Sequence, residues 1–192
     1  MKYLKMPWVA AVVMAATMAL ASPALATIST SPAGTLYTGT LKGASEGHLI
    51  MHASNGIRVE CNGTLEGSIE SHGASVTGKG KGEKWEYTCT GGDKVHSITF
   101  GAIELHTTGK GVGTVTSTGT TGEVTDSTGV TCGYRTEATD LGIVTDSGLT
   151  GGKATIHISA KILRHSGSIL CGSTGTLTGF AVVNTPEKLF ID

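Results

Sequence analysis

The chain has 192 residues, of which 29 are glycine, 5% are aromatic and 15% are charged, and its formal net charge is −1. This balance leaves no basic patch for nucleic acid, and glycine with abundant threonine is typical of many short strands joined by turns. Low-complexity disorder is the alternative interpretation of so much Gly, Ser and Thr. Alternating apolar residues that continue almost to the C-terminus favour a folded β protein.

Residues 1–26 have the pattern of a secretory signal peptide. Lys2 and Lys5 precede an apolar run from Trp8 to Leu20, and Ala24-Leu25-Ala26 forms a small-residue cleavage site. The apolar run is too short to span a bilayer comfortably, so we expect no membrane anchor. Cleavage would remove two lysines, change the net charge from −1 to −3 and leave an exported chain, extracellular, on the cell surface or in the periplasm.

Period-2 alternation predicts strands along most of the remaining chain. Residues 27–34 are expected to be a mobile lead-in and residues 78–84 a charged glycine loop, and Gly91-Gly92 should break the chain. In the clearest strand, 154–162, alanine and isoleucine face one way and Thr, His, Ser and Lys the other. Further strands are expected at residues 35–41, 49–51, 57–61, 65–69, 85–89, 95–100, 103–107, 168–171 and 177–183, with another inside 109–122.

Two similar segments, 123–127 and 143–147, each end in Thr-Asp-Ser and reach a glycine soon afterwards. The simpler interpretation is a pair of strand-to-turn exits in which Asp and Ser supply local hydrogen bonds. A shared binding role is the alternative. No amphipathic helix is predicted after the leader. The sequence therefore predicts one all-β domain over residues 27–192, an antiparallel β-sandwich with a barrel as the alternative, preceded by a cleaved signal helix.

The chain contains four cysteines, an even number that in an exported protein indicates two disulfides. Of the three possible pairings we favour the sequential one, Cys61 with Cys89 and Cys132 with Cys171. A zinc site is the alternative, but no C-x-x-C or H-x-x-x-H pair accompanies these cysteines. We therefore expect no metal site and no cofactor.

Two kinds of candidate site remain. Trp85 and Tyr87 share a strand face with Cys89, where they serve either as core packing or as contacts for a ligand. Residues 43–47 spell G-x-S-x-G, the motif of serine esterases, but strand-like segments flank Ser45 and no helix follows it. The seven histidines lie mostly on the polar phase of their strands. We expect no catalytic residue.

Several segments are similar to those of a family of small secreted bacterial proteins. They are residues 131–134, 139–142, 154–160 and 167–172, with a closing Thr185-Pro186 and Leu189-Phe190-Ile191. The resemblance covers most of the chain after residue 26 and implies a secreted β protein, with no catalytic residue carried over. Ser31-Pro32-Ala33-Gly34-Thr35 and the Thr/Gly-rich texture also resemble the exported activator of alkane oxidation.

Three classes of function follow from these features. The first is a non-enzymatic surface, matrix or adhesion protein, and the second is a binding module for carbohydrate or apolar small molecules that uses Trp85 and Tyr87. The third, less favoured, is a hydrolase that uses Ser45. Self-association is also possible if residues 27–34 add as a strand to a neighbouring subunit, although they could equally have no role.

Overall fold

A computed structural model describes residues 27–31, 34–73, 76–137 and 140–192. The predicted signal peptide, residues 1–26, lies outside these ranges. Among the described residues a single helix has four residues, and strands make up most of the rest. The strands are β1 Ile28–Ser29, β2 Thr38–Ser45, β3 Leu49–Ala53, β4 Arg58–Gly73, β5 Val76–Cys89, β6 Lys94–Thr99, β7 Ala102–Gly109, β8 Val112–Ser117, β9 Thr121–Thr125, β10 Thr131–Thr136, β11 Asp140–Thr145, β12 Thr155–Gly167, β13 Thr174–Thr185 and β14 Phe190–Ile191, and the helix is α1 Ser147–Thr150.

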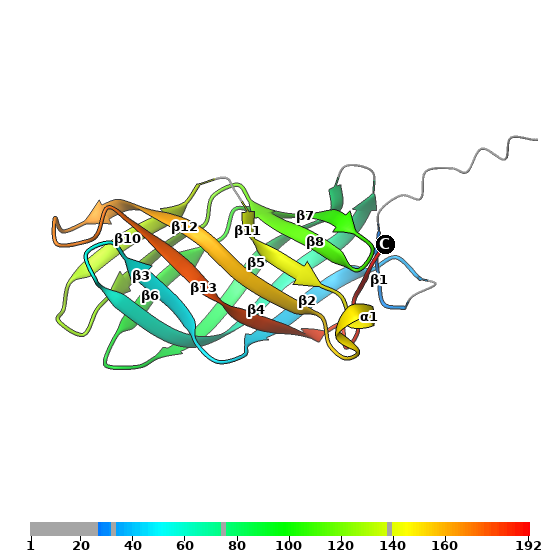
Figure 1. The fold of residues 1–192 in the computed structure, drawn as a ribbon, viewed down its shortest axis with the longest axis horizontal. Coiled ribbons are helices and arrows are strands. Elements are labelled where there is room, and N and C mark those ends of the chain that lie inside the picture. The colour runs from blue at the N-terminus through cyan, green and yellow to red at the C-terminus, as the bar shows by residue number, and fades with distance from the viewer. Residues whose placement is uncertain (1–26, 32–33, 74–75, 138–139) are drawn as a thin grey trace, which may run out of the picture.

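Antiparallel pairing joins twelve of these strands into one sheet that closes on itself (Figure 1). The closed circuit runs β2, β4, β5, β7, β8, β11, β12 and β13, and β13 pairs again with β2. Outside this circuit, β3 pairs with both β13 and β4. A further set of strands extends from β12: β12 pairs with β10, β10 with β9, and β9 with β6. The all-β prediction is confirmed. The sheet has two sandwich-like layers, and its closure corresponds to the barrel alternative.

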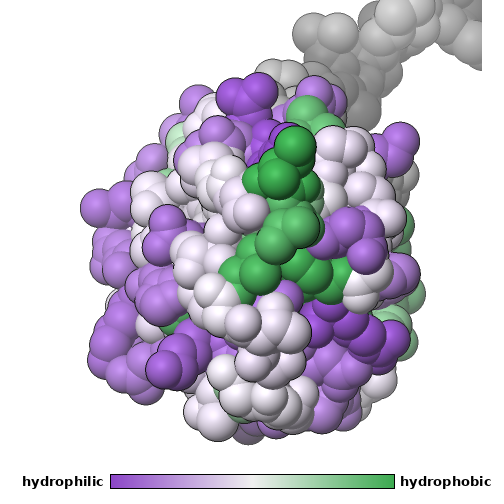
Figure 2. Space-filling model, turned by 90° about the vertical axis from the view of Figure 1, so that its left-hand side faces the viewer, coloured by the Kyte–Doolittle hydropathy of each residue, from purple (hydrophilic) through white to green (hydrophobic). Residues whose placement is uncertain are grey.

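Alternation of side chains along the long strands explains this architecture. In β12 the side chains of Ala160 and Ile162 are buried, whereas those of Ser159 and Lys161 are exposed. Since successive residues of a strand point to opposite faces, such a strand places an apolar row inside and a polar row outside. The end of the molecule seen in Figure 2 is mostly hydrophilic or neutral, apart from one hydrophobic ridge.

The segment 78–84, predicted as a loop, is instead the middle of β5. Its lysines face outward and its glycines inward, so the period-2 pattern is present but the inward positions carry no side chain. Other elements fill that space: a Cβ on Gly78 would lie 2.2 Å from Ile28 Cδ1, and one on Gly82 would lie 2.7 Å from the Phe100 ring. Glycine here admits neighbouring side chains and does not mark a turn.

The lead-in also differs from the prediction where it is described. Residues 28–29 form β1 and pair with β14, and backbone hydrogen bonds link Thr27 and Asp192 in both directions. Ile28 and Ile191 are completely buried. This segment is therefore docked against its own chain. Self-association through it stays a prediction and would require this docking to be released.

Both predicted disulfides, Cys61–Cys89 and Cys132–Cys171, are present. The first joins directly paired residues of β4 and β5, and the second ties β10 to the turn between β12 and β13. The first therefore links two consecutive strands, whereas the second links segments that are 39 residues apart.

Removing the Cys132–Cys171 disulfide should lower stability substantially. Its cysteines are 39 residues apart, and a loop of that size is expected to contribute about 4 kcal/mol on the chain-entropy model. Urea unfolding of a Cys132→Ala/Cys171→Ala variant measures the loss. The 28-residue separation of Cys61 and Cys89 gives a slightly smaller expected loss for the matching pair variant, and an unchanged unfolding free energy in both would contradict the argument.

Candidate functional site: an apolar cavity inside the closed sheet

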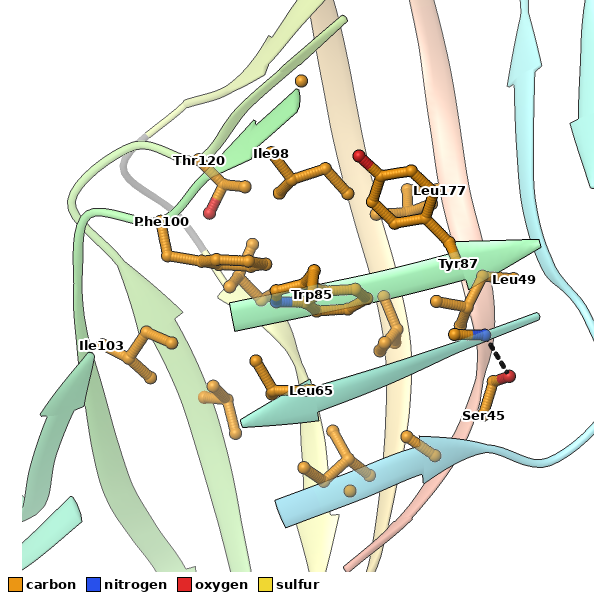
Figure 3. Close-up of a pocket in the computed structure, with 18 of the residues that line it drawn as sticks. Ser45, Leu49, Leu65, Trp85, Tyr87, Ile98, Phe100, Ile103, Thr120 and Leu177 are labelled. Carbon is orange, nitrogen blue, oxygen red and sulfur yellow. Dashed lines mark hydrogen bonds between the residues drawn. The ribbon is translucent and has the colours of Figure 1, made fainter. Parts of the chain in front are cut away.

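The closed sheet encloses a cavity of about 260 Å³ whose lining is almost entirely apolar. Its walls include Leu65 of β4, Ile98 of β6 and Leu177 of β13 (Figure 3). Val59 and Ile69 of β4 both line it, and they are separated by about 30 Å at the usual rise of a strand. The cavity is therefore long relative to its volume and runs along the interior.

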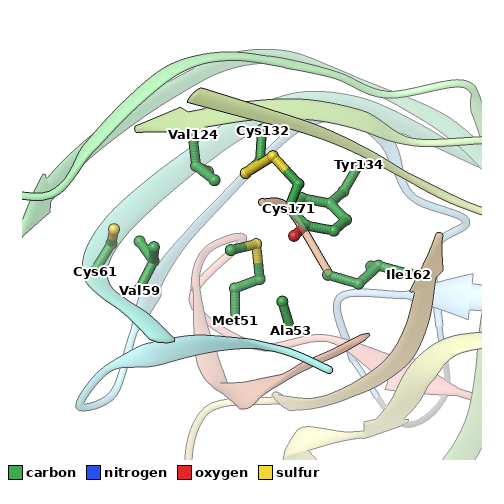
Figure 4. Close-up of a cluster of buried hydrophobic side chains, with 9 residues drawn as sticks. All are labelled: Met51, Ala53, Val59, Cys61, Val124, Cys132, Tyr134, Ile162 and Cys171. Atoms are coloured by element: carbon green, nitrogen blue, oxygen red, sulfur yellow. A yellow bond between two sulfur atoms is a disulfide. The ribbon is translucent and has the colours of Figure 1, made fainter. Parts of the chain in front are cut away.

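Two buried clusters lie along this cavity. One contains the Cys132–Cys171 disulfide together with Met51, Val59, Tyr134 and other apolar residues (Figure 4). The second contains Ile28, Leu189 and Ile191. Residues of both clusters line the cavity, so the space lies between them. Burial raises the pKa of the Tyr134 hydroxyl.

An inward-facing glycine keeps part of the cavity open. Gly122 lines it. A Cβ on Gly122 would meet only the Ser97 carbonyl oxygen at 3.5 Å and Ile98 Cγ1 at 3.7 Å, which are ordinary van der Waals distances. A side chain at this position would therefore extend into the empty space.

Trp85 and Tyr87, the predicted ligand contacts, both line the cavity and are half-buried. The Trp85 ring stacks on Phe100, with 5.0 Å between ring centroids and 18° between planes. Among the described residues the buried Trp85 indole N–H has no hydrogen-bond partner. A buried donor without a partner is costly and is uncommon in folded proteins.

The wall beside Trp85 is held together differently from the rest of the sheet. Although β6 follows β5 in sequence, it pairs with β9, and no ladder joins it to β5 anywhere in the described parts of these strands. The stack of Trp85 on Phe100 bridges this gap. Side-chain packing is easier to rearrange than a strand ladder, so the β5–β6 seam is the part of the wall best suited to open.

Sequence reasoning found Trp85 and Tyr87 but missed the other cavity walls, notably Phe100, Gly122 and Leu177. Phe100 lies just beyond the end of β6, and its ring packs on Trp85 of β5. The spacing of residues along the chain does not reveal this contact. The alternation of glycine with charged residues in 78–84 was the signal in the sequence that the inward face of this strand carries no side chains.

Ser45, the residue of the esterase-like motif, lies at the end of β2. Its hydroxyl accepts a hydrogen bond of 2.9 Å from the Gly63 N–H. Within the described ranges no histidine or carboxylate is hydrogen-bonded to Ser45, and a nucleophilic serine needs such a base to accept its proton. The observed geometry gives this serine a structural contact between β2 and β4.

Three of the seven histidines, His48, His72 and His106, each lie beside a glutamate near the surface. His48 lies 3.4 Å from Glu60, and His72 lies 2.8 Å from Glu70. The described residues contain no group of three or more His, Cys, Asp or Glu side chains able to hold a metal ion. The same described ranges include no helix long and apolar enough to cross a membrane.

Comparison with known proteins adds no assignment: no family model, curated protein or solved structure matches this chain. The cavity and its walls are therefore the basis on which a function can be argued.

Proposed function

We propose that this chain is an exported, non-enzymatic binding protein that holds an apolar small molecule inside its closed sheet. The observation that carries the proposal is the apolar cavity of about 260 Å³. Folded interiors are normally packed without voids of this size, whereas ligand sites are concave and mainly apolar. The signal-peptide pattern and the two disulfides support a location in an oxidising compartment outside the cytoplasm.

The lining favours an alkyl chain over a carbohydrate. A sugar buried here would lose the hydrogen bonds that its hydroxyl groups make with water, and an almost entirely apolar lining would not replace them. The length of the cavity relative to its volume suits an unbranched chain.

Ligand binding can be followed through Trp85, the sole tryptophan of residues 27–192. We expect 1-decanol to change Trp85 fluorescence and to displace 1-anilinonaphthalene-8-sulfonate from the protein, because both compete for the apolar interior. Cellobiose is the matched control and should do neither. Displacement by cellobiose with no response to decanol would contradict the proposal.

A further inference from the structure

The turn between β12 and β13 presents two large aliphatic side chains to solvent. Ile169 is 90% exposed and Leu170 is 62% exposed. This turn forms the far end of the molecule from α1 (the orange turn at the left of Figure 1), and the view onto that end shows a hydrophobic ridge among hydrophilic residues (Figure 2). Exposed aliphatic residues are ordinary when scattered, but two adjacent ones at a protruding tip form a continuous apolar point.

The turn is held firmly in this shape. The Arg164 guanidinium donates hydrogen bonds to the carbonyls of Ser168 and Cys171, at 3.0 and 2.9 Å. The Asn55 side chain donates to the Leu170 carbonyl, and Cys171 is tied to β10 by its disulfide. The exposure of the two aliphatic side chains is therefore built into the turn.

These same contacts prepare the turn for an apolar environment. The carbonyls of Ser168, Leu170 and Cys171 all accept protein hydrogen bonds, and the Leu170 N–H donates to the Ser168 hydroxyl at 3.1 Å. A polar backbone group taken into lipid without a partner is costly, so a turn whose groups are already paired can enter at lower cost.

The charge of the surrounding hairpin indicates which surface it would meet. Near the tip, residues 160–175 contain no aspartate or glutamate, but they contain Lys161 and Arg164. The neighbouring turn at this end does carry a carboxylate, Asp126, which accepts hydrogen bonds from Thr128 and Val130. A basic hairpin in a chain of net charge −1 is complementary to an anionic lipid surface.

We propose that the Ser168–Cys171 turn docks this protein on an anionic lipid surface, with Ile169 and Leu170 inserted among the acyl chains. Two side chains on a convex tip are too few for a stable protein interface, which buries about 800 Å² on each partner. They suit the shallow insertion that interfacial anchors use. Docking would bring the cavity to the phase in which an apolar ligand dissolves, and this last point rests on the proposed function.

Vesicle co-sedimentation tests the proposal with the chain that begins at Thr27. On vesicles of phosphatidylglycerol and phosphatidylcholine, an Ile169→Ser/Leu170→Ser variant should partition about tenfold or more weakly than the parent. Leu149→Ser is the matched control, since Leu149 is 60% exposed on α1 at the other end, and it should bind like the parent. Vesicles of phosphatidylcholine alone should bind the parent more weakly.

Three outcomes would overturn the docking proposal: no binding of the parent to anionic vesicles, equal binding of parent and double variant, or a parent that self-associates through this tip and loses that association in the double variant. Binding of 1-anilinonaphthalene-8-sulfonate in solution separates the two proposals. The double variant should retain it, because Ile169 and Leu170 do not line the cavity. Loss of vesicle binding with retained probe binding identifies the tip as the docking element, whereas absent probe binding in the parent contradicts only the cavity proposal.

Discussion

Replacing Gly122 with leucine should weaken ligand binding by about tenfold or more, because the new side chain would occupy the space that the ligand needs. Gly122 lies in β9 and lines the cavity. Its Cβ position makes only ordinary contacts, so the leucine can extend inward without displacing backbone. Displacement titration with 1-anilinonaphthalene-8-sulfonate measures the loss, and urea unfolding establishes that the variant is folded.

Gly152 provides the matched control for this substitution. It is exposed between α1 and β12, and a Cβ there would meet no atom within 4 Å. Gly152→Leu adds the same side chain to the outside of the protein and should leave probe affinity unchanged. A folded Gly122→Leu protein that binds the probe as tightly as the parent would place the ligand elsewhere and would remove the main support for the proposed function.

The strands and disulfides could be predicted because their signals are local. Alternation in 154–162 fixes which side chains of β12 face inward, and the sequential cysteine pairing, which closes loops of moderate size, is the one found. The shared face of Trp85 and Tyr87 follows from the same period of two. The Thr-Asp-Ser exits also behave as the simpler interpretation predicts: Asp126 accepts from Thr128 N–H, and Asp146 accepts from Leu149 N–H.

Closure of the sheet and the cavity could not be predicted because they depend on contacts distant in sequence. Pairing of β2 with both β4 and β13 makes the circuit, and no local pattern specifies β13 as a neighbour of β2. Gly82 in isolation indicates a loop, but it becomes a strand residue because Phe100 packs over it. Which inward-facing residues of different strands line the cavity together depends on the register of every strand pair.

Replacing Asp146 with alanine should cost about 3 kcal/mol of stability, the largest expected loss for a single side chain outside the cysteines and the apolar core. The Asp146 side chain is 5% exposed, and its two carboxylate oxygens serve different elements. Oδ1 accepts from the Leu149 N–H at 2.9 Å and caps α1, while Oδ2 accepts from the Ile191 N–H of β14 at 3.2 Å. Alanine would leave both donors without a partner at the end of the sheet where α1 and β14 lie.

Asp126 is the matched control, because it occupies the same Thr-Asp-Ser context in an exposed turn. The hydrogen bond from the Thr128 hydroxyl lowers the pKa of Asp126, yet water can replace its contacts when the carboxylate is removed. Asp126→Ala should therefore cost about 1 kcal/mol or less. Asp146→Asn keeps one acceptor oxygen and should fall between the two, so urea unfolding of the three variants gives an ordered series. Equal losses of unfolding free energy at Asp126 and Asp146 would show that the buried carboxylate does not hold β14 in place. The end of the sheet beside β14 would then depend on the packing of Ile28, Leu189 and Ile191 alone.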